Sequence, residues 1–215
     1  MPVPETFFED YFQALLAGDS DRCFSIIQTW LSQEGTILEI YEELFQRSLY
    51  QVGDLWSKGL LTVADEHIAT AMTERLMAQL QAVMIKAESN RKRVLVSCIT
   101  SDYHQIGARM AANLFELHGW ESYYLGANLP IPDLLKAIER IQPAVTALSL
   151  VLRDQLKVLE LTLGEIRTKH PQLPVIVGGR AFTGLESDPL EIGPLPQVYI
   201  LKSISELEHL IASFG

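Results

Sequence analysis

The stretch VLVSCITSDYHQIGARMAANLFELHGW, residues 94–120, decides the fold of the second half of this chain. Its apolar start, rich in β-branched residues, predicts a buried strand that ends near Ile99. A polar Ser-Asp-Tyr-His segment follows, and from residue 105 apolar side chains recur at helical spacing. We therefore expect a strand, then a loop that carries Asp102 and His104, and then a helix over residues 105–118.

The same alternation continues to the end of the chain. Helical patterns at 131–141 and 154–169, and one beginning near Ser203, lie between or after further apolar runs. Those runs predict four more strands, at residues 121–126, 144–151, 173–179 and 196–201. Strands that alternate with helices predict an α/β fold of the Rossmann-like (flavodoxin-like) kind, a parallel five-stranded sheet with helices on both faces.

Ligands bind such sheets off the carboxyl ends of the strands. Asp102, His104, Ser149 and the pair Gly178-Gly179 all fall at or just beyond predicted strand ends. Neither the Gly-x-Gly-x-x-Gly fingerprint of dinucleotide sites nor a Gly-x-x-x-x-Gly-Lys-Ser/Thr phosphate loop occurs in the sequence. A nucleotide-dependent α/β enzyme with a catalytic His104 is therefore disfavoured, and it stays as a third alternative.

The first part of the chain, residues 4–86, carries apolar side chains at helical spacing almost throughout. Thr62 and Asp65 have the spacing of a capping box at the start of the last helix. Short connections between helices predict a four-helix bundle with helices near 4–17, 19–32, 36–58 and 62–86. The polar segment KAESNRKR then predicts a domain boundary, which gives a helical bundle cap at 1–88 and the sheet domain at 89–215.

Composition restricts the location and the partners of the protein. The chain has 215 residues and a formal net charge of −10, which disfavours direct binding to nucleic acid. It lacks an apolar run of roughly 20 residues, the length needed to cross a bilayer, and its acidic N-terminus does not resemble a secretory signal. We therefore expect a cytoplasmic protein that does not bind membranes, with Cys23 and Cys98 as free thiols.

Asp102 and His104 form a pair with a chemical use. The carboxylate is close enough in sequence to accept a proton from one imidazole nitrogen, which would leave the other nitrogen to bind a metal or a proton. Gly107 follows three residues later, and the absence of a Cβ there allows a ligand to approach closely. A lone loop histidine is usually only solvated, so the prediction depends on the three residues together.

The pattern Asp102-x-His104-x-x-Gly107 resembles the signature of the cobalamin-binding domain family. The resemblance implies that His104 is the metal ligand of this protein and replaces the cofactor's own base beneath the cobalt. The family's remaining marks follow at similar spacing and are Ser149, Val151, Gly178 and Gly179. The resemblance implies that they line a slot for the displaced dimethylbenzimidazole tail. The family often has leucine or threonine where Val151 stands.

The bundle carries a second resemblance. Trp56 is followed after nine residues by Glu66 and His67, as in light-responsive, adenosylcobalamin-dependent repressors of the MerR type and related anti-repressors. This similarity implies that Trp56 covers the upper cobalt face and that Glu66 and His67 help to hold the upper ligand. Some of these repressors place a histidine directly after the tryptophan, where this chain has Ser57. His67 or water would then occupy the cobalt after the upper ligand is lost.

Two functions follow from these resemblances. The first is a cobalamin sensor or photoreceptor in transcription regulation, not itself an enzyme, that signals through bundle movement to a partner regulatory protein. Its expected cofactor is adenosylcobalamin, with methylcobalamin and hydroxocobalamin as alternatives. The repressors also carry a helix-turn-helix domain, for which we expect no room in this chain. The second function is a corrinoid methyl carrier that serves a methyltransferase. The sequence leaves homo-oligomerisation open.

Overall fold

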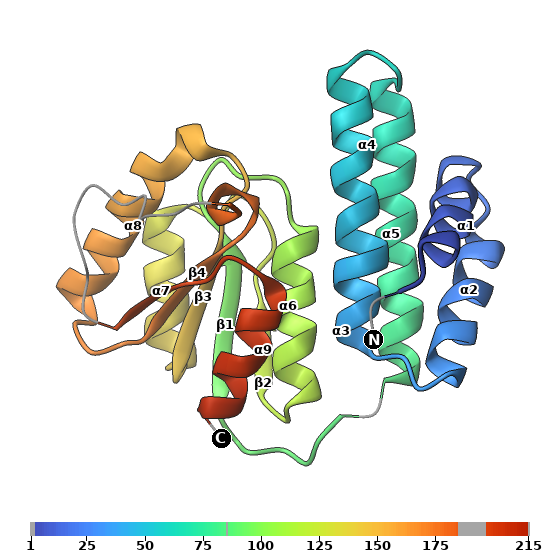
Figure 1. The fold of residues 1–215 in the computed structure, drawn as a ribbon. Helices are drawn as coiled ribbons and strands as arrows, with labels where there is room; N and C mark the ends of the chain where they lie inside the picture. Colours follow the sequence, from blue (N-terminus) through green and yellow to red (C-terminus); the bar gives the residue numbers. More distant parts are fainter. Residues whose placement is uncertain (1–2, 85, 185–196, 215) are drawn as a thin grey trace. The chain divides into compact units, whose positions relative to one another are not determined.

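The structure is a computed structural model of the chain that describes residues 3–84, 86–184 and 197–214. The chain divides into two compact units, Met1–Met84 and Ile85–Gly215. The first unit is helical and the second contains the sheet (Figure 1). The boundary that we predicted after residue 88 falls within residues 86–92, which form neither helix nor strand.

The helical unit has well-defined helix starts. Asp19 accepts a hydrogen bond from the backbone N–H of Arg22, and Thr36 and Thr62 each form a capping box with an acidic residue three positions later. Such side chains satisfy backbone N–H groups that have no partner within the helix. The helices are α1 (Glu5–Leu16), α2 (Ser20–Ser32), α3 (Ile37–Glu39), a π-helical segment (Ile40–Gln46), α4 (Arg47–Ser57) and α5 (Val63–Val83).

The third predicted helix, 36–58, is helical along its length but contains the π-helical segment Ile40–Gln46. A period near 3.6 predicts a helix without distinguishing i→i−4 from i→i−5 hydrogen bonds, so the sequence did not predict this segment. Tyr41 and Phe45 within it are fully buried, and the ring of Phe45 lies 6.1 Å from that of Tyr11 on α1. Aromatic packing of this kind forms the core of the unit.

The sheet domain contains five parallel strands in the order β2-β1-β3-β4-β5, which confirms the predicted fold class. The strands are β1 (Arg93–Cys98), β2 (Glu121–Tyr124), β3 (Val145–Ser149), β4 (Val175–Gly178) and β5 (Val198–Ile200). Residue 196, the first of the predicted last strand, lies outside the described residues. In this order β2 lies on one side of β1 and β3 lies on the other side. The topological switch point therefore lies between β1 and β3.

Helices cover both faces of this sheet (Figure 1). They are α6 (Ile106–Leu117), α7 (Ile131–Ile141), α8 (Leu156–Lys169) and α9 (Ile204–Ser213). Helices α7 and α8 bury Ile138 and Leu163 against Leu148 and Val177 of the central strands. Helices α6 and α9 pack together on the opposite face. Burial on both faces explains why the central strands are continuous apolar runs and not alternating ones.

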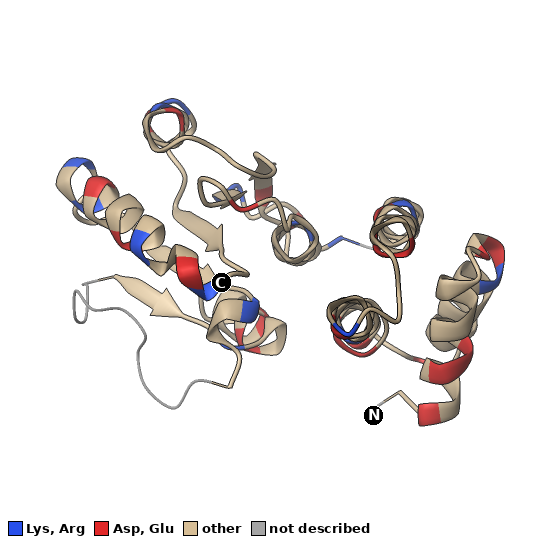
Figure 2. Cartoon of the chain, turned by 90° about the horizontal axis from the view of Figure 1, so that it is seen from above, with Lys and Arg blue, Asp and Glu red and all other residues tan. Residues whose placement is uncertain are grey.

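Charged residues are concentrated on helices and connecting segments (Figure 2). The strands β3 and β4 contain no charged residue, as expected for strands at the centre of a covered sheet. Within the described residues, none of the helices combines the length and the apolar character that crossing a bilayer would require.

Candidate functional site

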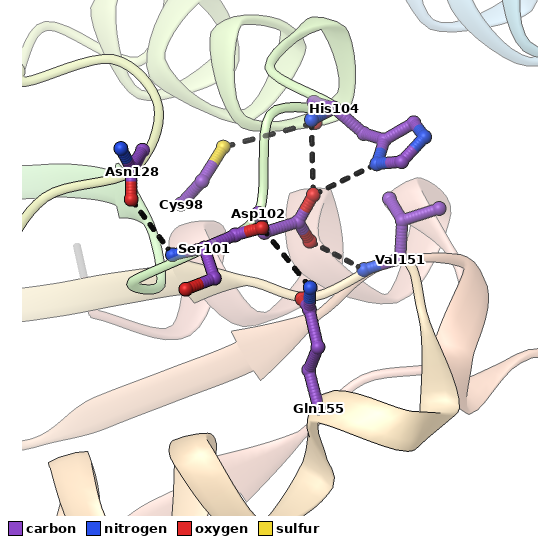
Figure 3. Close-up of polar contacts among 7 residues, drawn as sticks. All are labelled: Cys98, Ser101, Asp102, His104, Asn128, Val151 and Gln155. Carbon is purple, nitrogen blue, oxygen red and sulfur yellow. Dashed lines mark hydrogen bonds and ion pairs between the residues drawn. The ribbon is translucent and has the colours of Figure 1, made fainter.

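The loop between β1 and α6 carries the carboxylate and the imidazole. Asp102 is fully buried, and its Oδ1 accepts hydrogen bonds from the backbone N–H of His104 at 2.9 Å and from His104 Nδ1 at 2.9 Å. Its Oδ2 accepts a third hydrogen bond, at 2.8 Å, from the backbone N–H of Val151 (Figure 3). Burial by itself would raise the pKa of Asp102, but these three hydrogen bonds lower it below its ordinary range. The carboxylate is therefore charged at neutral pH.

This arrangement determines which imidazole nitrogen carries a lone pair. A charged carboxylate can only accept hydrogen bonds, so the neutral ring of His104 carries its proton on Nδ1. The lone pair then belongs to Nε2, the nitrogen that can bind a metal. The side chain of His104 is 54% exposed although its partner Asp102 is fully buried. An oriented ring on a buried support is an arrangement that suits a metal ligand.

The predicted slot residues meet at one edge of the sheet. The strand register pairs Cys98 with Ser149 and Ser149 with Gly178, so the ends of β1, β3 and β4 lie side by side. A Cβ built on Gly107, at the start of α6, would have Ser149 Oγ as its nearest neighbour, at 4.0 Å. A Cβ on Gly178 would also make only ordinary contacts, the nearest at 3.6 Å from the carbonyl oxygen of Leu201. Internal packing therefore does not require glycine at either position, which fits residues that leave room for a flat ligand.

Gly179 differs from these two glycines. Its φ of +119° is unusual for a residue with a side chain, and an added Cβ would collide with the carbonyl of Leu150. The backbone of Leu150 also donates a hydrogen bond to the carbonyl of Gly178 at 2.9 Å. The loop geometry is thus sufficient to explain Gly179, whereas it does not explain Gly107 or Gly178.

The predicted site residues of the bundle lie on the α4–α5 hairpin. Trp56, in the last turn of α4, is 49% exposed. In the first turn of α5, His67 Nε2 lies 3.5 Å from Glu66 Oε2, and the His67 side chain is 74% exposed. Glu66 Oε1 also accepts a hydrogen bond from the Thr70 hydroxyl at 2.8 Å. Within the described part of the hairpin, no hydrogen bond joins Trp56 to either of the two residues on α5.

Two further residues contact the histidine loop and have no motif in the sequence that predicts this. Asn128, after β2, and Gln155, after β3, form hydrogen bonds with the backbone of Ser101 (Figure 3). An asparagine in a loop is a weak signal of left-handed backbone, and Asn128 indeed has a φ of +53°. The partner of such a residue depends on the fold and has no signal in the sequence.

Both units of the chain are similar to known proteins. Residues 7–81 and 92–195 both match families described as B12 binding domain. The chain is 30% identical to the HTH-type transcriptional repressor CarH of Myxococcus xanthus over 84% of its own length, and it spans 60% of the length of that repressor. It is 25% identical to trimethylamine corrinoid protein 1 of Methanosarcina acetivorans, covering 68% of this chain and 70% of that protein.

The fold has a counterpart among solved structures. The monomethylamine corrinoid protein of Methanosarcina barkeri superposes with a TM-score of 0.79, covering 99% of this chain and 100% of that one. Because the sequence identity is only 12%, this similarity concerns the fold. The named relatives are regulators and corrinoid proteins.

Proposed function

Since this chain belongs to the B12-binding domain family and its cofactor is cobalamin, we propose that it is a cobalamin-dependent sensor with His104 as the lower axial ligand. The hydrogen bond of 2.9 Å between His104 Nδ1 and the buried Asp102 carboxylate carries this assignment. It orients an exposed ring and leaves the lone pair on Nε2. Asp102 is thus a positioning residue, and His104 is the residue that would contact cobalt.

The strand ends fit the tail of the cofactor. The absence of a side chain at Gly107 and Gly178, where an added Cβ would meet only ordinary contacts, supports a site for a flat aromatic ring beside them. The Ser149 hydroxyl, at the end of β3, can donate a hydrogen bond to a nitrogen of such a ring. Val151 contributes its backbone N–H to Asp102, so a change of its side chain to leucine or threonine keeps that contact. Gly179 shapes the loop beside the slot.

The hairpin residues would act on the upper ligand. When bound, cobalamin supplies a cobalt–carbon bond that light or a methyl-accepting partner can break. Trp56 offers an exposed flat surface, and the Glu66 carboxylate can accept hydrogen bonds from ribose hydroxyls. The exposed His67 can take part in holding the upper ligand, and Ser57 cannot replace it as a nitrogen ligand. We expect these side chains to favour adenosylcobalamin as the native form.

The similarity to CarH supports a regulatory role, because it covers 84% of this chain. Loss or change of the upper ligand would rearrange the bundle and alter its contact with a partner regulatory protein. We expect this to occur in the cytoplasm and without direct contact between this chain and nucleic acid. Light is the signal that we propose for removal of the upper ligand.

A second candidate function is a methyl carrier for a methyltransferase. The 25% identity to trimethylamine corrinoid protein 1, over 68% of this chain, supports it. It would use His104 and the strand-end slot in the same way. In a carrier, however, the upper face must stay accessible to the partner enzyme, so Trp56, Glu66 and His67 would have no ligand to hold.

Spectroscopy with three cofactors tests the proposal. The protein is mixed in the dark with adenosylcobalamin, methylcobalamin or hydroxocobalamin, and spectra are recorded before and after green light. A histidine-ligated spectrum with adenosylcobalamin that changes on illumination, together with a change in oligomer size, supports the sensor. Preference for methylcobalamin, with methyl transfer on addition of a methyltransferase, supports the carrier. A spectrum identical to that of His104→Ala contradicts the axial assignment.

A further inference from the structure

Asn128, in the loop after β2, holds three consecutive residues of the histidine loop. Its Oδ1 accepts a hydrogen bond from the backbone N–H of Ser101 at 2.9 Å. Its backbone N–H donates to the carbonyl of Asp102 at 2.9 Å, and its Nδ2 donates to the hydroxyl of Tyr103 at 3.0 Å. One residue therefore fixes the backbone on the N-terminal side of His104.

Gln155, after β3, holds the same loop from another direction. Its Nε2 donates a hydrogen bond to the carbonyl of Ser101 at 3.0 Å. Both backbone groups of Ser101 are thus bound by side chains from two different strand-end loops (Figure 3). Ser101 has a φ of +70°, in the region that favours glycine. A serine persists in that conformation only where its surroundings impose it.

The conformation of Ser101 affects the position of the residue after it. That residue, Asp102, is the buried carboxylate that orients the ring of His104. A rotation of the backbone at Ser101 would move this carboxylate away from Val151 N–H and from the ring together. The direction of the Nε2 lone pair therefore depends on residues that do not contact the ring.

We propose that Asn128 and Gln155 are positioning residues for the axial ligand, because they hold the left-handed backbone at Ser101 and thereby aim His104. This inference rests on the proposed function of His104 as the cobalt ligand. Partners that orient a metal ligand typically change metal affinity by about 10- to 100-fold when they are removed. The side chains of Asn128 and Gln155 act on His104 through Ser101 and Asp102. We therefore expect a change in metal affinity at the lower end of this range, roughly tenfold.

The first test uses the protein without cofactor. Asn128→Gly keeps the left-handed backbone and removes the side chain, and Gln155→Met keeps the length and removes the donor. The tautomer of His104 is measured from the nitrogen chemical shifts of its ring by NMR. We expect the form protonated on Nδ1 to dominate in the wild type and to lose population in both variants. The control is Gln142→Gly, a left-handed position (φ +51°) at the end of α7, and it should leave the tautomer unchanged.

The second test uses adenosylcobalamin. Each variant should show a roughly tenfold lower ratio of histidine-ligated to histidine-free cofactor in its visible spectrum. Asn128→Asp keeps an acceptor for the Ser101 N–H and should restore part of that ratio, which a general loss of stability would not do. Tyr103→Phe removes one hydrogen bond at an exposed side chain, with little risk to folding, and should give a smaller decrease of the same kind.

The outcomes separate the two proposals. If wild type and His104→Ala give the same cobalamin spectrum, the axial assignment is wrong, and the tautomer measurement still decides whether the two residues orient the ring. If the wild type is histidine-ligated and both variants keep its tautomer and its spectrum, the positioning role of Asn128 and Gln155 is wrong while the axial assignment stands.

Discussion

The sheet edge and the α4–α5 hairpin each place a histidine beside a carboxylate, and the two pairs are built differently. His104 lies 2.9 Å from Asp102, whose side chain is fully buried, whereas His67 lies 3.5 Å from Glu66, whose side chain is 35% exposed. The first carboxylate accepts three hydrogen bonds within its own domain, and it is positioned by the fold. The second pair is adjacent in sequence on one exposed helix turn.

This difference indicates two roles. A ligand that must form one directional bond benefits from a ring fixed before binding. A surface that must release or exchange a ligand benefits from side chains that become ordered only in its presence. We therefore infer that the sheet edge is the permanent attachment of the cofactor and that the hairpin responds to its upper ligand.

The largest expected effect is on stability, from removal of the buried carboxylate. Asp102→Ala leaves the backbone N–H groups of His104 and Val151 without their acceptor, and hydrogen bonds to a charged group contribute about 1.5–3 kcal/mol each. We expect the free energy of unfolding of the sheet domain to fall by about 2–4 kcal/mol. Glu66→Ala, the matched change on an exposed turn, should cost less than about 0.5 kcal/mol.

The two buried cysteines allow this comparison to be measured in each unit separately. Burial raises the pKa of Cys23, in the bundle, and of Cys98, in the sheet domain, to about 12 in each case, which keeps both thiols protonated and unreactive. A thiol reagent therefore reacts with each cysteine only when the unit that buries it opens. Asp102→Ala should accelerate labelling of Cys98 and leave that of Cys23 unchanged. Equal acceleration at both positions would contradict the separate stability of the two units.

The next effect concerns the bond to cobalt. His104→Ala should fold normally, because its side chain is half exposed, and should abolish the histidine-ligated spectrum of bound adenosylcobalamin. We expect the affinity for adenosylcobalamin to fall by more than the roughly tenfold effect of a residue that only orients the ligand. His67→Ala is the matched control on the hairpin and should keep the lower-ligand spectrum. A variant at His67 that lost this spectrum would reverse the roles assigned to the two histidines.

A smaller effect is expected at the hairpin tryptophan. Trp56→Ala should change the preference between adenosylcobalamin and hydroxocobalamin by roughly tenfold, equivalent to about 1.4 kcal/mol, because an exposed ring contributes only to ligands large enough to reach it. Isothermal titration with both cofactors measures this ratio. An equal loss of affinity for both forms would show that Trp56 has a structural role only.

The smallest effect concerns the start of helix α5, which carries Glu66 and His67. Thr62 Oγ1 accepts a hydrogen bond from the Asp65 N–H at 3.2 Å, and Thr62→Ala should cost the bundle about 1 kcal/mol in thermal or urea unfolding. Hydrogen bonds from the Thr62 hydroxyl and N–H lower the pKa of Asp65. The stabilisation from this pair is therefore present above pH of about 4, the ordinary aspartate pKa, and is lost as the pH falls through the lowered value. Thr62→Ala removes the hydroxyl but keeps the backbone N–H, so it should reduce that pH dependence. Thr100→Ala, in the sheet domain, should leave the pH dependence unchanged.

Local sequence patterns were sufficient to predict the helices and strands of this protein but not the residues at which they begin and end. The strand predicted over 121–126 ends at Tyr124, and the helix predicted from residue 154 begins with a 3-10 turn at Arg153–Gln155. Hydrophobic period reports which segments are buried, whereas the exact ends depend on hydrogen bonds to neighbouring segments. The π-helical segment Ile40–Gln46 had no signal in the pattern for the same reason.

The sequence by itself determined the alternation of strands and helices, the loop with Asp102 and His104, and the family resemblance, because all of these are short-range patterns of residue type. Only the tertiary structure decided that Val151 N–H binds the buried carboxylate and that Asn128 and Gln155 hold the loop before it. These contacts join residues 27 to 54 positions apart. The parallel register that brings strand ends together creates them, and no local pattern encodes which loop residues then meet.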